Sequence, residues 1–241
     1  MNVKIRLIRH ATLRLEVAGR RILVDPQLDP AGARPAIENT PNPRPNPLVE
    51  LPIPAAEVVA GIEAVLLTHL HRDHLDSTAE ELLPRHVPVF CQPDDAERLR
   101  GLGFDARPVQ ESLDWSGLTI HRTRARHGTG TVGERMGPAS GYVIGRLYIA
   151  GDTVWCREVA AAIQVHSPKL AVVNAGAARF LDSDPIVMTA ADVAEVARRV
   201  PEVVAVHMEA VNHCLLSRAE LKQAVPSLHV PEDGAELEFT I

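Results

Sequence analysis

Residue types that bind metal ions are concentrated directly after the apolar run 64–67. The chain continues Thr-His-Leu-His-Arg-Asp-His, so His69, His71, Asp73 and His74 occupy four of six consecutive positions. A loop that leaves a strand can turn alternate side chains toward one point, and two histidines can then share one ion while the next two residues face another. Neutral imidazole suits zinc and related divalent ions, and a carboxylate adds charge and an oxygen ligand. The spacing therefore predicts a two-metal site.

Three further candidate ligands lie where other extended runs meet loops. These residues are His127, Asp152 and His207. A catalytic two-ion site needs ligands from distant segments, and loops at the ends of strands can bring such ligands together. The alternative interpretation of positions 69–74 is a polar surface loop that is rich in histidine.

In this order and spacing, the candidate ligands resemble those of the metallo-β-lactamase superfamily. Its members carry Thr-His-x-His-x-Asp-His, then a lone His, an Asp in a Gly-Asp-Thr-like turn and a final His. The resemblance implies an α/β fold of the αββα sandwich type, with two facing mixed β-sheets and helices on the outside. It also implies one ion on His69, His71 and His127, a second ion on Asp73, His74 and His207, and Asp152 as the bridge between them.

Shorter motifs resemble one branch of that superfamily. The opening His10-Ala11-Thr12 and the later Asp25-Pro26 are similar to ascorbate-6-phosphate lactonase-like proteins and to phospholipase D-type enzymes that act on N-acyl ethanolamine lipids. The stretches 174–180, 185–189 and 207–214 also resemble uncharacterised bacterial members. The resemblance therefore covers nearly the whole chain, but these motifs do not specify a substrate.

Length and composition narrow the class of protein. The 241 residues are enough for one large core, and we expect a single domain over 1–241. A net charge of −6 gives no basic surface for nucleic acid. The start of the chain does not resemble a signal peptide, and no apolar run reaches membrane-spanning length. We expect a cytoplasmic protein with no membrane span and with free thiols at its three cysteines. Its expected partner is a small-molecule substrate, and the sequence leaves open whether the protein forms a homo-oligomer.

The proline-rich segment at about 30–54 interrupts the predicted strands and helices. Seven prolines fall between Pro35 and Pro54, which neither a helix nor a central strand tolerates. One interpretation is an exposed irregular connection. The other is a proline-stiffened lid or wall over the metal cleft, because long loops in compact domains are often functional.

Hydrophobic periodicity and capping motifs indicate the regular elements. Alternating runs at 3–9, 13–17 and 22–25 predict a meander of strands. Helices are predicted over 77–83 and 93–101.

Two further motifs bear on local structure. Capping boxes at Thr189 and Ser217 predict that helices begin there. The glycine-rich run 128–133 lacks the strand-to-helix context of a phosphate-binding loop, and we interpret it as a flexible hairpin tip.

Several polar residues are candidates for the substrate pocket. His213, Glu209 and Asn212 follow the final ligand within two turns, where residues often line a pocket. His213 could shuttle protons or bind substrate, or could instead cap a helix or pack in the core. Arginine can hold a carboxylate or phosphate in bidentate fashion, and Arg135 and Arg179 are the candidates.

Two more residues could have a role at the metal cleft. His10 could donate a hydrogen bond there, and we count it with the substrate residues, or it could simply occupy a turn. Asp73 could accept a proton in addition to binding metal.

The expected activity is metal-dependent hydrolysis. Two divalent ions can hold a bridging hydroxide at neutral pH, because coordination lowers the pKa of bound water toward about 7. We expect zinc, with manganese and iron as alternatives that the ligands alone do not separate. The expected substrate is small and ester-like, a lactone or a phosphoester with an anionic group. The alternative functions are a non-catalytic metal-binding protein of this fold and an oxygen-reducing di-iron protein.

Overall fold

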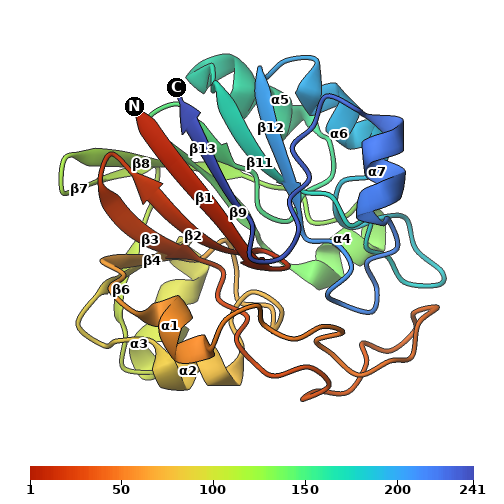
Figure 1. Ribbon diagram of the computed structural model, residues 1–241, viewed down its shortest axis with the longest axis horizontal. Coiled ribbons are helices and arrows are strands. Elements are labelled where there is room, and N and C mark those ends of the chain that lie inside the picture. The colour runs from red at the N-terminus through yellow and green to blue at the C-terminus, as the bar shows by residue number, and fades with distance from the viewer.

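Two β-sheets face each other in the computed structural model, which describes residues 1–241 (Figure 1). The first sheet has seven strands in the order β13-β1-β2-β3-β4-β5-β6, and the second has six in the order β12-β11-β10-β9-β8-β7. The strands span β1 Asn2–Arg9, β2 Thr12–Val17, β3 Arg20–Val24, β4 Ala64–Leu66, β5 Pro88–Cys91, β6 Asp105–Pro108, β7 Ser112–Trp115, β8 Leu118–Arg124, β9 Ser140–Ile144, β10 Leu147–Ile149, β11 Leu170–Asn174, β12 Glu202–Val206 and β13 Glu236–Thr240.

Both sheets are mixed. The first contains the antiparallel meander β1-β2-β3, after which β3, β4, β5 and β6 run parallel. In the second sheet β10, β11 and β12 are parallel, whereas β7 to β10 are antiparallel. The carboxyl ends of parallel strands lie at one edge of a sheet, where the loops that follow them can form a site.

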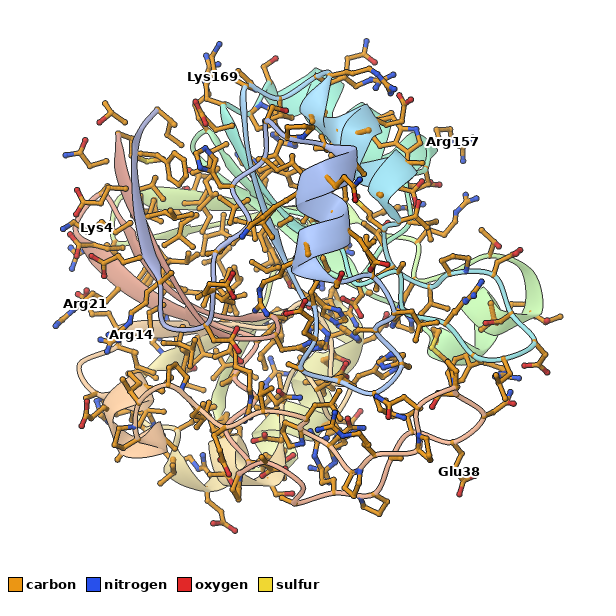
Figure 2. The ribbon with its side chains drawn as sticks, turned by 45° about the vertical axis from the view of Figure 1, so that its right-hand side comes forward. Lys4, Arg14, Arg21, Glu38, Arg157 and Lys169 are labelled. Atoms are coloured by element: carbon orange, nitrogen blue, oxygen red, sulfur yellow. The ribbon has the colours of Figure 1, made fainter.

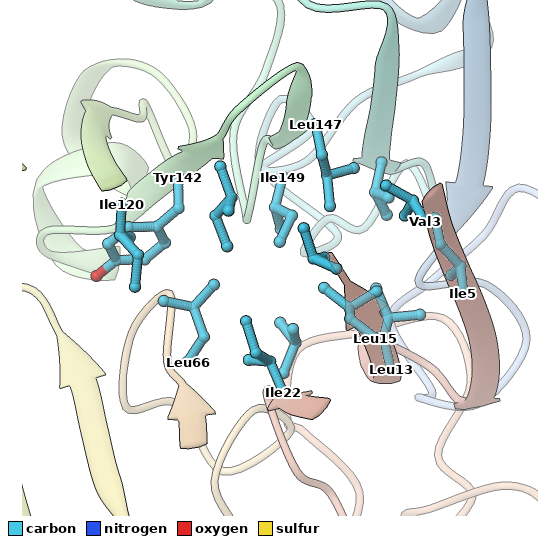
Figure 3. Close-up of a cluster of buried hydrophobic side chains, with 14 of the residues drawn as sticks. Val3, Ile5, Leu13, Leu15, Ile22, Leu66, Ile120, Tyr142, Leu147 and Ile149 are labelled. Atoms are coloured by element: carbon cyan, nitrogen blue, oxygen red, sulfur yellow. The ribbon is translucent and has the colours of Figure 1, made fainter. Parts of the chain in front are cut away.

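The space between the sheets is filled by apolar side chains. Along β1, Val3 and Ile5 are buried while Lys4 between them points away from the core, as the two-residue period of a strand requires. Figure 2 shows Lys4, Arg14 and Arg21 on the outer side of this sheet. Figure 3 shows how the inward residues of β1 to β4 meet those of β8 to β10, including Tyr142, across the interior.

Helices cover the outer face of each sheet (Figure 1). Residues of α1, α2 and α3 pack against the first sheet, and residues of α5, α6 and α7 pack against the second. The helices span α1 Ala55–Val59, α2 Ser77–Leu82, α3 Ala96–Gly101, α4 Gly130–Met136, α5 Arg157–His166, α6 Ala190–Ala197 and α7 Arg218–Ala224, and a short 3-10 helix, η1, spans Pro93–Asp95. The predicted αββα sandwich is therefore confirmed. None of the helices combines the length and apolarity that crossing a membrane would need.

Most local predictions agree with the structure. The strand meander and the helices after Asp76 and Gln92 lie where periodicity placed them. Thr189 and Ser217 are N-caps of α6 and α7, each with the reciprocal hydrogen bonds of a capping box. The proline-rich segment 30–54 contains no helix or strand, only an isolated bridge between Arg34 and Asn46.

The prediction for the glycine-rich run 128–133 was wrong. The chain forms α4 from Gly130 onward instead of a hairpin tip. A side chain at Gly133 would lie 2.7 Å from the carbonyl oxygen of Gly128, so glycine allows the helix to pack tightly on the turn before it. This packing overrides the low helix propensity of glycine.

Candidate metal centre

Three imidazoles from two loops converge at the edge of the sandwich. Nε2 of His69 lies 3.0 Å from Nδ1 of His71, and Nε2 of His127 lies 3.3 Å from the same nitrogen. Nitrogen ligands at about 2.0–2.1 Å from a tetrahedral ion lie about 3.4 Å from one another. The three nitrogens therefore have the spacing of ligands around one ion.

A second group lies next to the first. Nε2 of His207 is 3.3 Å from Nε2 of His74 and 3.8 Å from Oδ2 of Asp73. Nε2 of His74 is 4.0 Å from the same carboxylate oxygen. Two imidazoles and one carboxylate with these separations could hold a divalent ion with slight adjustment of the side chains.

Asp152 lies between the two groups. Its Oδ2 atom is 3.4 Å from Nε2 of His127 and 3.9 Å from Nε2 of His69. Its Oδ1 atom is 3.3 Å from Nε2 of His207, and Oδ2 is also 3.3 Å from Nε2 of His74. One carboxylate thus faces nitrogens of both groups. The seven side chains that the sequence grouped as ligands all meet here, and their chemistry fits a pair of divalent ions.

The backbone explains how distant segments deliver these ligands. The first loop follows β4, and the single ligands follow β8, β10 and β12. Gly151, with φ +66°, makes the turn before Asp152, and a side chain there would lie 2.6 Å from the carbonyl oxygen of Ser140. His207 itself has φ +69°, and its N–H donates to the carbonyl of His10. These tight turns fix the side chains where the strands end.

Hydrogen bonds to the far nitrogen orient three of the candidate imidazole ligands. Nδ1 of His74 lies 2.8 Å from Oδ2 of Asp25, and Nδ1 of His127 lies 2.8 Å from the carbonyl oxygen of Ile186. Nδ1 of His69 lies 3.1 Å from Oγ1 of Thr68. A proton held on Nδ1 leaves the lone pair of Nε2 free to bind a metal.

Two buried residues outside the ligand set contact its carboxylates. Nδ2 of Asn174 donates to Oδ1 of Asp152 over 2.6 Å. Nε2 of His10 lies 3.2 Å from Oδ2 of Asp73. Sequence reasoning gave Asn174 no role, although its position at the end of β11, beside the ligand strands, was a usable signal. It also gave Asp25 no role beyond its motif.

The protonation states suit metal ligation. Burial alone would raise the pKa of Asp152, but the surrounding imidazoles, His207 foremost, hold it well below its ordinary value. Burial would also raise the pKa of Asp73, but the neighbouring imidazoles, His74 foremost, hold it well below its ordinary value. Burial lowers the pKa of His69 well below the ordinary value for histidine. Burial likewise lowers the pKa of His207 well below that value, whereas the burial of His74 is outweighed by the charges of Asp152 and Asp25, which hold its pKa well above it. The site therefore offers ionised carboxylates and, at His69 and His207, neutral imidazole nitrogens, and His74 would release its proton on binding a divalent ion.

A cavity of about 350 Å³ opens onto the ligands. Its floor includes the ligands His71, Asp73, His127 and Asp152, and Arg34, Arg72, Asn46 and His213 are its other polar lining residues. Its apolar walls are formed by Pro35, Ile37, Met136, Phe180, Ile186 and Val211. The two arginines and the walls from segment 34–46 were not foreseen as individual residues, because their positions depend on the path of an irregular loop.

Among the predicted substrate residues, His213 is the one that lines the cavity. The residue is 5% exposed, and its Nδ1 atom is buried without a hydrogen-bond partner. His10 is fully buried behind Asp73 and does not line the cavity. The aromatic ring of Phe180 also lines the cavity.

The structure does not bring the other four predicted substrate residues into the cavity. Arg135 and Arg179 are exposed, and neither lines it. Glu209 forms an ion pair with Arg218 at the start of α7. Asn212 is fully buried, and its side chain bonds to the proline-rich segment. These residues follow the ligands in sequence, but local turns direct their side chains elsewhere.

Comparison with known proteins identifies the family. A model of the β-lactamase superfamily domain matches residues 20–208. The chain is 35% identical to the UPF0173 protein YddR of Bacillus subtilis over 249 aligned residues, which cover 96% of this chain and 98% of that protein. It is 30% identical to a UPF0173 metal-dependent hydrolase of Azorhizobium caulinodans, with 72% of this chain and 73% of that protein covered.

Solved structures give the same assignment. The fold is similar to an isothiocyanate hydrolase from Delia radicum gut bacteria, with a TM-score of 0.91, 34% identity and 99% of both chains covered. It is also similar to a possible metal-dependent hydrolase from Veillonella parvula, with a TM-score of 0.93, 32% identity, and 98% and 99% of the two chains covered. The superfamily expected from the ligand motif is confirmed, whereas neither of the two branches suggested by the short motifs is. The chain belongs to the β-lactamase superfamily and, within it, to the UPF0173 family of metal-dependent hydrolases.

Proposed function

We propose that the protein is a dinuclear metal-dependent hydrolase that acts on a small molecule in the cavity above Asp152. The observation that carries this proposal is the carboxylate of Asp152, whose two oxygens face both groups of ligands. Two bound divalent ions would supply an acidified water molecule and a Lewis acid at the cavity floor. Imidazole-rich donors with two carboxylates suit zinc first, with manganese and iron as alternatives.

The chain's own residues would handle protons and orient the substrate. Asp73 lines the cavity with an ionised carboxylate, which can accept a proton from the attacking water. Burial lowers the pKa of His213 to about 4, so its imidazole is neutral at neutral pH. A neutral imidazole on the cavity wall can donate one hydrogen bond to the substrate or to its leaving group.

The cavity favours a substrate with an apolar substituent. Its walls carry Ile37, Met136, Phe180 and Ile186, while Arg135 and Arg179 lie outside it. An anionic phosphoester would therefore lack the contacts with Arg135 and Arg179 expected from the sequence. The two arginines that do line the cavity, Arg34 and Arg72, are already paired with Asp29 and Glu80. Of the two ester-like classes, this lining favours a lactone with an apolar side chain, because its burial is favourable and its electrophilic carbon is neutral.

An isothiocyanate is the second candidate substrate. The observation that favours it is the full-length similarity to an isothiocyanate hydrolase at 34% identity. An isothiocyanate also joins a neutral electrophilic carbon to an apolar substituent. Water would add across its carbon–nitrogen double bond, and the resulting thiocarbamic acid would break its carbon–nitrogen bond to release an amine and carbonyl sulfide.

The test is hydrolysis by protein that has been reconstituted with zinc, manganese or iron. The panel would hold alkyl-substituted lactones, an acyl-homoserine lactone, benzyl isothiocyanate and bis-p-nitrophenyl phosphate. We expect turnover of a lactone or of the isothiocyanate, with the phosphodiester poorest. Asp152→Asn should abolish turnover, whereas Asp114→Asn, a surface substitution on β7, should not. Two equivalents of bound metal with no turnover of any panel member would contradict the proposed substrate class, and binding of one equivalent at saturation would contradict the dinuclear site.

A further inference from the structure

One wall of the cavity is held in place with almost no apolar burial. Arg34, Pro35, Ile37 and Asn46 of the proline-rich segment line the cavity. No residue from 31 to 45 is buried. A segment that buries so little apolar surface gains little from the hydrophobic effect, and hydrogen bonds must fix its position.

Asn212 makes most of these hydrogen bonds from a fully buried position. Its Nδ2 atom shares its two hydrogens among three acceptors, the carbonyl oxygens of Ile37 at 3.0 Å and Asn42 at 2.7 Å and Oγ1 of Thr40 at 2.7 Å. Its Oδ1 atom accepts from the N–H of Ile37 at 3.1 Å and from Nδ2 of Asn46 at 2.7 Å. Its own N–H donates to Oδ1 of Asn46 at 2.9 Å. One amide therefore fastens both ends of the stretch 37–46.

The tip of the segment is tied to the opposite wall. The carbonyl oxygen of Asn39 accepts a hydrogen bond from the N–H of Leu181 at 2.8 Å. The side chain of Asn39 donates through Nδ2 to Oδ1 of Asp182 at 2.7 Å. Leu181 directly follows Phe180, which lines the cavity. Glu38, beside this contact, points into solvent (Figure 2). The segment is thus a wall anchored at its base by Asn212 and at its tip by Asn39.

We propose that Asn212 is a positioning residue that sets substrate specificity by fixing this wall, without contacting the substrate. Its neighbours Val211 and His213 line the cavity, so the turn that presents them also holds Ile37, which lines the same cavity. The inference rests on the proposed function for the identity of the substrates. The position of the wall can be tested without any substrate.

Hydrogen exchange and proteolysis of the metal-loaded protein test the anchor directly. Asn212→Ala should speed amide exchange in 35–47 about tenfold or more, because it leaves Asn46 and several partly buried groups of the segment unpaired and raises the open population. Cleavage after the exposed Glu38 by a glutamate-specific protease should accelerate in parallel. The matched control is Asn42→Ala, which removes only a local contact with the N–H of Arg44. Exchange at Arg44 should rise in this variant, whereas exchange in the rest of 35–47 and the cleavage rate should stay unchanged.

Kinetics test the consequence for specificity. The ratio of kcat/KM for benzyl to methyl isothiocyanate should change several-fold in Asn212→Ala through KM, with kcat and metal content nearly unchanged. A wild type that turns over neither compound would count against the isothiocyanate as substrate, and the exchange result would still decide whether Asn212 holds the wall.

A milder variant guards against general unfolding. Thr40→Val removes one acceptor of the Asn212 amide together with the hydroxyl's own contacts with the carbonyl oxygens of Ile37 and Asn42. It should give a smaller increase in exchange over the same segment, because the other bonds of Asn212 remain. Wild-type exchange in Asn212→Ala would overturn the inference. So would faster exchange spread evenly over both sheets, or an unchanged substrate ratio despite a loosened wall.

Discussion

Two side chains outside the ligand set orient the carboxylates of Asp152 and Asp73. Asn174 donates to Asp152, and His10 lies within hydrogen-bond distance of Asp73. Burial lowers the pKa of His10, so both contacts involve neutral groups. A neutral donor orients a carboxylate without cancelling its charge, and groups of this kind commonly affect metal affinity as strongly as some ligands do.

Removing the amide of Asn174 should weaken metal binding. Asn174→Ala leaves Oδ1 of Asp152 without its donor, and we expect affinity to fall about 10–100-fold. A competition titration against a chromophoric chelator would measure the change. Asn2→Ala, at the exposed start of β1, is the control. Unchanged affinity of both ions in Asn174→Ala would show that the amide does not hold the bridge.

His10 should act selectively on the second group of ligands. The ring centroid of His10 lies 3.6 Å from that of His207, whereas the centroids of His74 and His207 are 5.3 Å apart. The ring of His10 therefore stacks on the ring of a candidate ligand. We expect His10→Ala to weaken one ion about tenfold or more and to spare the other. His10→Gln, which keeps a donor, should recover part of the loss. The measurement is stepwise cobalt titration by absorption, and equal weakening of both ions would contradict this role.

The convergence of the seven candidate ligands could be predicted from the sequence, because their residue types are rare and their spacing is local. Four of them lie within positions 69–74, and the other three each follow an extended run. The cavity residues could not be predicted in this way. Asn212 follows the last ligand closely, yet its side chain turns to the proline-rich segment, and Arg34 reaches the cavity from an irregular loop. No short motif indicates where the side chain of Asn212 or of Arg34 points.

At the scale of elements, strands and capped helices follow from periodicity, whereas loops require tertiary information. β1 to β3 alternate as predicted, and α6 and α7 begin at their capping boxes. The error at α4 comes from local packing, since the tight contact between Gly128 and Gly133 is not visible in propensities. The wall formed by 34–46 likewise depends on a distant amide.

The cap of α6 allows fold stability to be separated from the metal centre. Oγ1 of Thr189 accepts from the N–H of Asp192, and the helix packs Val193 and Val196 onto the second sheet. Thr189→Ala should cost about 1 kcal/mol of unfolding free energy, measured by urea titration of the metal-free protein. Metal affinity should stay at the wild-type value, because Thr189 contacts no ligand. A parallel loss of affinity would show that the cap also supports the site.

Across the whole molecule, the apolar core and the polar site are spatially separate. Three apolar clusters of 22, 18 and 17 buried residues fill the space between the sheets and under both helical layers. The ligands lie at one edge of the sandwich, where Asp25, Asp73 and Asp152 are buried together. The core can therefore maintain the fold, while the buried carboxylates require cationic partners to offset their desolvation.

Removing the metal should consequently destabilise the protein without unfolding it. Ligands that bind only the native state add RT ln(1 + [L]/Kd) to stability, which is about 2.7 kcal/mol for one ion at a hundredfold excess over Kd. Calorimetry before and after dialysis against a chelator should show a lower Tm, while far-UV circular dichroism at 25 °C stays unchanged because the three apolar clusters remain intact. Readdition of zinc should restore the Tm in the wild type, but only partly in Asp152→Asn, which lacks the shared charge. Loss of the circular dichroism signal on chelation would mean that the ions hold the two sheets together and that the apolar core alone does not.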